Sequence, residues 1–337
     1  MKTRSHPLLI QITIFFLVLH LPAMGWGYDV DTGHAPITGV AFDAYASCFP
    51  DDNTFSRNHR RLARRGNIAM DKGVNKLPLK YWAYPRVQGL FHLSQRAINW
   101  HFFNPNKTDQ AITRRKAVEQ SQRQLWQRAK AGFAAMRDPD SKVIFLGALL
   151  HLTEDVSVPA HVVPVYHGPT SVTSLGQFEP LVDYLKNTGR IDGAKISDAI
   201  DALAPDTTWL RGQFQPGSKN CSEIRQARAS TPDEIRNNLA MATLSALKTP
   251  IANCNNATWG IFWNGEICSE KNKYFDAYNI DIPEFNRNGH IIDQQNRRLC
   301  TLREGDGRYR AFVNARHLEA VKADLHLLRW ASRRLAP

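Results

Sequence analysis

The sequence contains no unbroken apolar run of about 18 residues, which excludes a protein with several membrane-spanning helices. It has no Gly-X-Y period, no internal repeat and no low-complexity tract, so collagen-like and repeat architectures are excluded as well. The motifs HExxH, GxSxG and GxGxxG and the Walker loop are also missing, which removes several familiar enzyme classes. What remains is a basic chain of 337 residues, 43% hydrophobic, with a formal net charge of +12. Such a chain is long enough to bury one large core.

Cysteine is scarce, with five residues and no CxxC spacing, so the sequence predicts no zinc–thiolate site. The five are Cys48, Cys221, Cys254, Cys268 and Cys300. Cys254 and Cys268 flank a short aromatic segment, and we expect these two to form a disulfide. The odd count leaves at least one cysteine unpaired within the chain.

Residues 1–25 have the pattern of a secretory signal peptide. Two basic residues precede a mostly apolar segment, Leu8–Leu21, and small residues end the pattern at Gly25. Cleavage there would make Trp26 the mature N-terminus and leave a net charge of +10, because two basic residues and no acidic one are removed. We therefore expect a secreted or periplasmic protein.

Helical periodicity dominates residues 26–337 and predicts a single mostly helical domain, an all-α fold with long loops. Asp138–Ser141 is predicted to end one helix and cap the next, and Ser230–Glu234 has the pattern of a helix cap with proline at the first helical position. A small β-hairpin is predicted within residues 290–313, with its turn at Glu304–Gly307. The predicted helices are Thr108–Met136, Lys142–Val156, Phe178–Asn187, Pro232–Leu247 and Asn314–Leu335.

The segment Leu146–His161 (LGALLHLTEDVSVPAH) carries the clearest functional pattern. His151 and Asp155 are four positions apart, so both lie on one face of a helix, about 6 Å apart along its axis. Pro159 ends that helix, and His161 follows directly. Polar groups that face an apolar core cost free energy unless something binds them, and imidazole and carboxylate are the usual non-thiolate zinc ligands. The pattern therefore predicts a metal site.

Further short motifs follow one another along the chain: Trp26-Gly27, His34, Gly66–Asp71, Trp100–Pro105, His167 and Gln177–Glu179. Together with the H-x3-D-x5-H pattern, these residues resemble the zinc-dependent phospholipase C and single-strand-specific nuclease superfamily. The similarity spans roughly residues 26–183. It implies a helical fold with three zinc ions, one of them bound by the amine and carbonyl of the N-terminal tryptophan.

The resemblance also implies a ligand set for each ion. Trp26, His34 and Asp155 would bind the first zinc; Asp71, His101, His151 and the shared Asp155 the second; and His161, His167 and Glu179 the third. Leu175 stands where the family has the second histidine of the third set, and His167 is taken in its place. His92 is an alternative to His101, which the HFFNP run favours. The remaining histidines are interpreted as structural or exposed, and Glu154 is expected to face away from the site.

The activity implied by the resemblance is hydrolysis of a phosphodiester by a water molecule activated between two zinc ions. Asp155 would bridge the ions, and Asp71 would orient or deprotonate the water. The SVPAH sequence and the seven residues between Trp26 and His34 favour the phospholipase C branch, which acts on phospholipids.

A nuclease of the same superfamily is the first alternative, and a zinc-stabilised secreted binding protein without catalysis is the second. The basic charge suits either an anionic membrane surface or nucleic acid. No protein partner is predicted.

Overall fold

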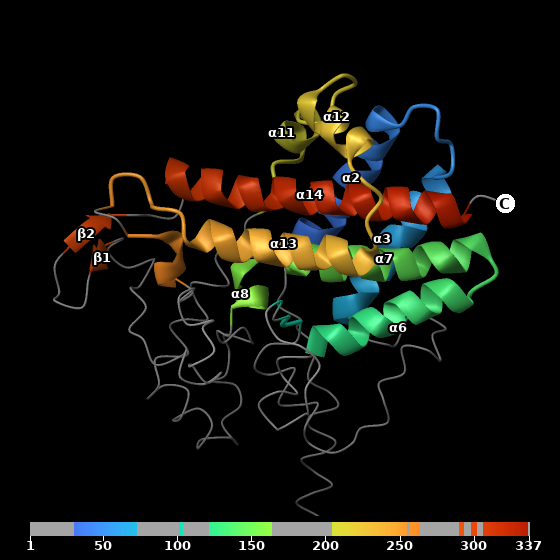
Figure 1. The fold of residues 1–337 in the computed structure, drawn as a ribbon, viewed down its shortest axis with the longest axis horizontal. Coiled ribbons are helices and arrows are strands. Elements are labelled where there is room, and N and C mark those ends of the chain that lie inside the picture. The colour runs from blue at the N-terminus through green and yellow to red at the C-terminus, as the bar shows by residue number, and fades with distance from the viewer. Residues whose placement is uncertain are drawn as a thin grey trace, which may run out of the picture.

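The computed structural model describes residues 30–72, 101–103, 105, 121–163, 204–254, 257–262, 290–292, 298–301 and 306–335. This part of the chain is mostly helical, which confirms the expected all-α class (Figure 1). In chain order its helices are η1 (Val30–His34), α2 (Ala35–Cys48), α3 (Arg57–Lys72), α6 (Ser121–Ala135), α7 (Pro139–Asp155), α8 (Pro159–Val162), α11 (Thr207–Gly212), α12 (Lys219–Gln226), α13 (Pro232–Leu247), η4 (Trp259–Phe262) and α14 (Gly307–Leu335). No helix in these ranges combines the length and the apolar character needed to cross a bilayer.

Helix α7 lies at the centre of the fold, in contact with α2, α3, α6, α13 and α14. From Val143 onward all but one of its residues, Ile144, are buried, so it has no polar face. A helix that is hydrophobic on all sides must be covered on all sides. The predicted capping segment lies at its start, where Asp138 accepts hydrogen bonds from the backbone N–H groups of Asp140 and Ser141. The central position of α7 places its last turn in the interior of the molecule.

Helices α3 and α7 cross at two glycines. A Cβ atom at Gly66 would lie 1.9 Å from the carbonyl oxygen of Ile144, and one at Gly147 would lie 1.9 Å from that of Ala63. Both positions therefore require glycine, because backbone atoms of the partner helix occupy the space that a side chain needs. The close crossing brings the end of α3 against the end of α7.

Helices α13 and α14 run antiparallel to each other over α7 (Figure 1). The start of α13 matches the prediction: Thr231 and Glu234 form a capping box, and Pro232 is the first helical residue. Helix α14 covers the predicted Asn314–Leu335 but begins seven positions earlier, at Gly307. At that start the carboxylate of Asp306 accepts the backbone N–H of Arg308, as helix-capping residues do.

The predicted β-hairpin is present, but its turn was placed wrongly. Strands β1 (His290–Ile292) and β2 (Arg298–Thr301) pair antiparallel, with Ile291 opposite Cys300. The connection lies between these strands, at 293–297, and not at Glu304–Gly307, where α14 begins. The Gly-Asp-Gly sequence is suited to a turn and to a helix start alike, and here it serves the helix.

Two disulfides join distant parts of the described chain. Cys48 at the end of α2 pairs with Cys221 on α12, and Cys254 pairs with Cys300 on β2. The expected Cys254–Cys268 pair is therefore wrong, because the β-ribbon brings Cys300 against the segment that follows α13.

The predicted helices Pro232–Leu247 and Lys142–Val156 are confirmed as α13 and, with a start three residues earlier, α7. Of Thr108–Met136, the described residues from Ser121 onward form α6. The predicted helix Phe178–Asn187 and the signal peptide at residues 1–25 lie outside the described residues.

Candidate metal centre

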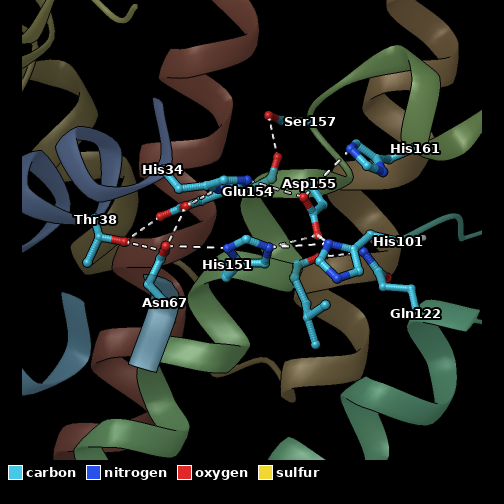
Figure 2. A network of polar contacts seen from close by, with 11 residues as sticks. His34, Thr38, Asn67, His101, Gln122, His151, Glu154, Asp155, Ser157 and His161 are labelled. Atoms are coloured by element: carbon cyan, nitrogen blue, oxygen red, sulfur yellow. Dashed lines mark hydrogen bonds and ion pairs between the residues drawn. The ribbon is translucent and has the colours of Figure 1, made fainter. Parts of the chain in front are cut away.

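Asp155, the last residue of α7, is the centre of a buried cluster of histidines (Figure 2). Its Oδ2 lies 2.8 Å from Nδ1 of His101 and 3.6 Å from Nε2 of His151. Its Oδ1 lies 3.3 Å from Nε2 of His34 and 3.7 Å from Nε2 of His161. Each carboxylate oxygen therefore faces its own pair of imidazoles.

The four histidines reach Asp155 from different elements. His151 lies one turn before it on α7, as the spacing predicted, and His161 lies on α8, which begins at Pro159. His34 is the last residue of η1, and its ring stacks on that of His151 with centroids 4.0 Å apart. The site thus joins segments that are more than 120 positions apart in the sequence.

The His101 segment is fixed by contacts on both of its sides. The backbone N–H of Phe103 donates to the carbonyl of His161 at 2.8 Å. The guanidinium of Arg236, on α13, lies 4.0 Å from the centroid of the Phe103 ring and 4.4 Å from that of Trp126. A buried arginine stacked between two aromatic rings holds both at a set distance. These contacts orient His101 toward Asp155, although His101 does not lie on a helix.

The spacing of the donor atoms fits a metal ion. Two atoms that each lie about 2 Å from one tetrahedral zinc are about 3.3 Å from each other. Four separations between the histidine nitrogens and their neighbours in the cluster, 3.2 to 3.7 Å, are of this size, and the 2.8 Å between Nδ1 of His101 and Oδ2 of Asp155 is shorter. One nitrogen of His34, one nitrogen of His151 and an oxygen of Asp155 lie within 4.8 Å of one another, all buried. This group could hold a metal ion.

Glu154, which was expected to face away, is a functional part of the cluster that the sequence analysis missed. It is fully buried, and its Oε2 lies 2.6 Å from Nδ1 of His34. It also accepts hydrogen bonds from the hydroxyl of Thr38 at 2.6 Å and the amide of Asn67 at 2.9 Å. A carboxylate on Nδ1 keeps the proton of a neutral imidazole on that atom, so Nε2 is the nitrogen whose lone pair can face a metal.

Helix α14 contributes a third buried carboxyl group, Asp324, against Glu154. Burial, the negative charge of Glu154 and a hydrogen bond to it raise the pKa of Asp324 well above its ordinary range. A raised pKa favours the protonated form of Asp324 next to Glu154.

The charges of the cluster favour an ionised Asp155. Burial opposes ionisation, but the charges of His101, His151 and His161 outweigh it and hold the pKa of Asp155 well below its ordinary range. Burial likewise opposes protonation of His34, but Asp155 and Glu154 raise its pKa to about 10. The carboxylates of Asp155 and Glu154 attract positive charge to His34. A divalent cation bound there can supply this charge in place of the proton on the imidazole.

The structure brings together five of the residues that the sequence proposed as ligands: His34, His101, His151, Asp155 and His161. Asp71 lies near the end of α3, outside the residues whose side chains are described. The other three, Trp26, His167 and Glu179, lie outside the described residues, as does His92, the alternative to His101.

Two of the histidines interpreted as structural or exposed have clear positions. His317 is buried on α14, where burial and the charge of His34 lower its pKa to about 3. His59 lies near the surface, with Nε2 3.4 Å from Oδ1 of Asp140. Comparisons of the chain with protein families, with curated proteins and with solved structures find no match.

Proposed function

We propose that this protein is a secreted zinc-dependent phosphodiesterase, most simply a phospholipase C that cleaves the glycerol side of the phospholipid phosphodiester. The observation that carries the proposal is the arrangement around Asp155, whose two oxygens face separate pairs of histidines. A carboxylate placed in this way is suited to bridge two metal ions. When bound, a zinc pair lowers the pKa of water toward about 7 and polarises phosphate oxygens.

The protein's own residues would prepare the site for that chemistry. His34 and His161 would bind on the Oδ1 side of Asp155, and His101 and His151 on the Oδ2 side. Glu154 would hold Nδ1 of His34 protonated and so present Nε2 to the metal. Because every one of these side chains is buried, they are fixed before a substrate arrives.

The remaining residues of the proposed three-zinc site come from the sequence resemblance. Trp26 would complete the first set with its amine and carbonyl, and His167 and Glu179 would complete the third with His161. Asp71 would join the second set and orient or deprotonate the attacking water. An N-terminal extension before Trp26 should then lower the zinc content, because an acylated nitrogen cannot bind zinc as a free amine does.

The two long-range disulfides support export, because such bonds persist in oxidising compartments. The basic charge of the chain supports an anionic partner, and a phospholipid surface is the one we favour.

The test uses protein that begins at Trp26 and is purified with zinc, incubated separately with phosphatidylcholine micelles and with single-stranded nucleic acid. We expect release of a phosphorylated head group, its loss in His151→Ala, and its retention in His59→Ala, whose histidine lies outside the cluster. Release of nucleotides in place of the head group would make the protein a nuclease. Zinc binding without either reaction would favour the binding protein and contradict the proposed activity.

A further inference from the structure

A second site of concentrated charge lies away from the metal centre, at the C-terminal end of α14. A pocket of about 520 Å³ opens there between α14 and the segment that joins α12 to α13. Its basic lining residues are Arg228, His326, Arg329, Arg333 and Arg334. The remaining lining residues are small or aromatic: Ala229, Ser230, Thr231 and Trp330. The pocket therefore has no acidic residue in its lining.

The pocket is distinct from the metal centre. His326, Arg329 and Arg333 are spaced by three and four positions and share one face of α14. Asp324, which contacts Glu154, lies on the opposite face of the same helix. An anion bound in the pocket would therefore be separated from Asp155 by the body of α14.

The arginine side chains lack the partners that usually neutralise them. Among the described residues no carboxylate lies within 4.0 Å of the guanidinium groups of Arg228, Arg329, Arg333 or Arg334. Glu234 is close enough to Arg228 for the two charges to interact, but its carboxylate is occupied by the backbone N–H and hydroxyl of Thr231. Several positively charged side chains therefore share one concave surface. Their mutual repulsion raises the free energy of the empty pocket, and a bound anion would lower it.

Two contacts hold the pocket in shape. Arg329 donates to the carbonyl oxygens of Ile224 at 2.7 Å and Ala227 at 3.1 Å, which ties the wall of the pocket to α14. Burial, followed by the charge of Arg333, lowers the pKa of Arg329, as expected where two cations face each other. Burial and the charges of Arg329 and Lys322 lower the pKa of His326 in the same way.

The aromatic residue in the pocket argues against recognition of a nucleobase. The Trp330 ring packs against Phe133, with centroids 4.8 Å apart, and the guanidinium of Arg334 lies 4.6 Å from its centroid. Stacking of a base would need one of these ring faces. The pocket would therefore recognise a ligand by its charge and shape, because planar guanidinium groups are suited to bind phosphate oxygens.

We infer that this arginine pocket is a phosphate-binding site, separate from the metal centre. Arg228 and Arg333, both exposed at the rim, would bind the phosphate oxygens directly, and Arg329 would fix the wall behind them. The phosphate can be free in solution or carried by a lipid head group, since the chemistry of recognition is the same. The inference does not depend on the proposed hydrolase activity.

The test measures binding of sodium phosphate to the zinc-loaded chain by calorimetry, and cosedimentation with phosphatidylcholine vesicles that contain or lack phosphatidylglycerol. Arg333→Glu should weaken binding about tenfold or more, the effect of losing a charge-assisted hydrogen bond. Arg228→Glu should act in the same direction. Arg310→Glu, an exposed position at the other end of α14, is the matched control and should bind as the unmodified protein does.

Loss of phosphate binding in Arg333→Glu but not in Arg310→Glu would support the site with a soluble ligand. If Arg333→Glu loses only the binding to vesicles, and that binding requires phosphatidylglycerol, the result would support the site with a lipid head group as the source of the phosphate. Absence of binding in both assays, or equal affinity in Arg333→Glu and Arg310→Glu, would overturn the inference. Unchanged zinc content in all three variants would show that the metal centre is not the cause of any loss.

Discussion

At the scale of single residues, the role of Glu154 depends on partners that are remote in the sequence. Its side chain is one position from Asp155, yet it bonds His34, Thr38 and Asn67, which lie on η1, α2 and α3. A helical pattern predicts which face of the helix a side chain lies on, but not which residues of other segments contact it. His151 and Asp155 could be predicted because their spacing is local, whereas the contacts of Glu154 could not.

Glu154→Gln should lower zinc affinity about 10- to 100-fold, the usual effect of removing a partner of a metal-binding histidine. The amide keeps the volume of the side chain but loses the charge that orients His34. Zinc affinity is measured by competition with a chromogenic chelator. Glu223→Gln, an exposed site on α12, is the control. Equal affinity in the two variants would contradict the role of Glu154.

His317 should make the protein less stable in acid. Its pKa falls from 6.5 in the unfolded chain to about 3 in the folded one, chiefly through burial. Below about pH 6.5 the unfolded state therefore binds a proton that the folded state does not, and stability decreases as the pH falls toward 3. The decrease approaches about 1.4 kcal/mol per pH unit.

Urea unfolding at a series of pH values checks this effect. His317→Gln should give a shallower slope of unfolding free energy between about pH 6.5 and pH 4 than the unmodified protein. The same slope in both proteins would show that His317 is not the group responsible.

At the scale of elements, the helices that the sequence revealed are those with clear ends or a clear periodicity. The capping segments Asp138–Ser141 and Ser230–Glu234 were predicted correctly, and α13 has the predicted bounds. Helix α2 was not predicted, because it is buried along most of its length and shows little amphipathic contrast. Helix α3 was not predicted either, although its buried residues recur at helical spacing.

The crossing of α3 and α7 makes a sharp prediction. Gly147→Ala places a methyl group against the backbone of Ala63 and should destabilise the fold by about 1 to 3 kcal/mol or more. The strain should also weaken zinc binding, because α3 carries Asn67, which bonds Glu154.

Denaturant unfolding measures the first effect and chelator competition the second. Gly212→Ala is the matched control, because a Cβ atom there meets nothing within 4 Å. If Gly147→Ala proved as stable as Gly212→Ala, the close packing of α3 on α7 would be contradicted.

At the scale of the whole molecule, the histidine–aspartate cluster was predicted from the sequence better than the connections between distant segments. The order of the short motifs along the chain carried enough pattern to name His34, His101 and His161, which the structure places around Asp155. The disulfide of Cys254 was misassigned because pairing depends on which segments meet in space, and neighbours in sequence are a poor guide to it.

We propose that Asp155 bridges metal ions, and the metal content of the purified protein is the most direct test of this role. Protein that begins at Trp26, dialysed against a zinc buffer and then against buffer alone, is analysed by mass spectrometry for bound metal. We expect more than one zinc per chain, a marked loss in Asp155→Asn and no loss in Asp140→Asn, an exposed carboxylate. Less than one zinc per chain in the unmodified protein, or equal zinc content in the two variants, would contradict the account.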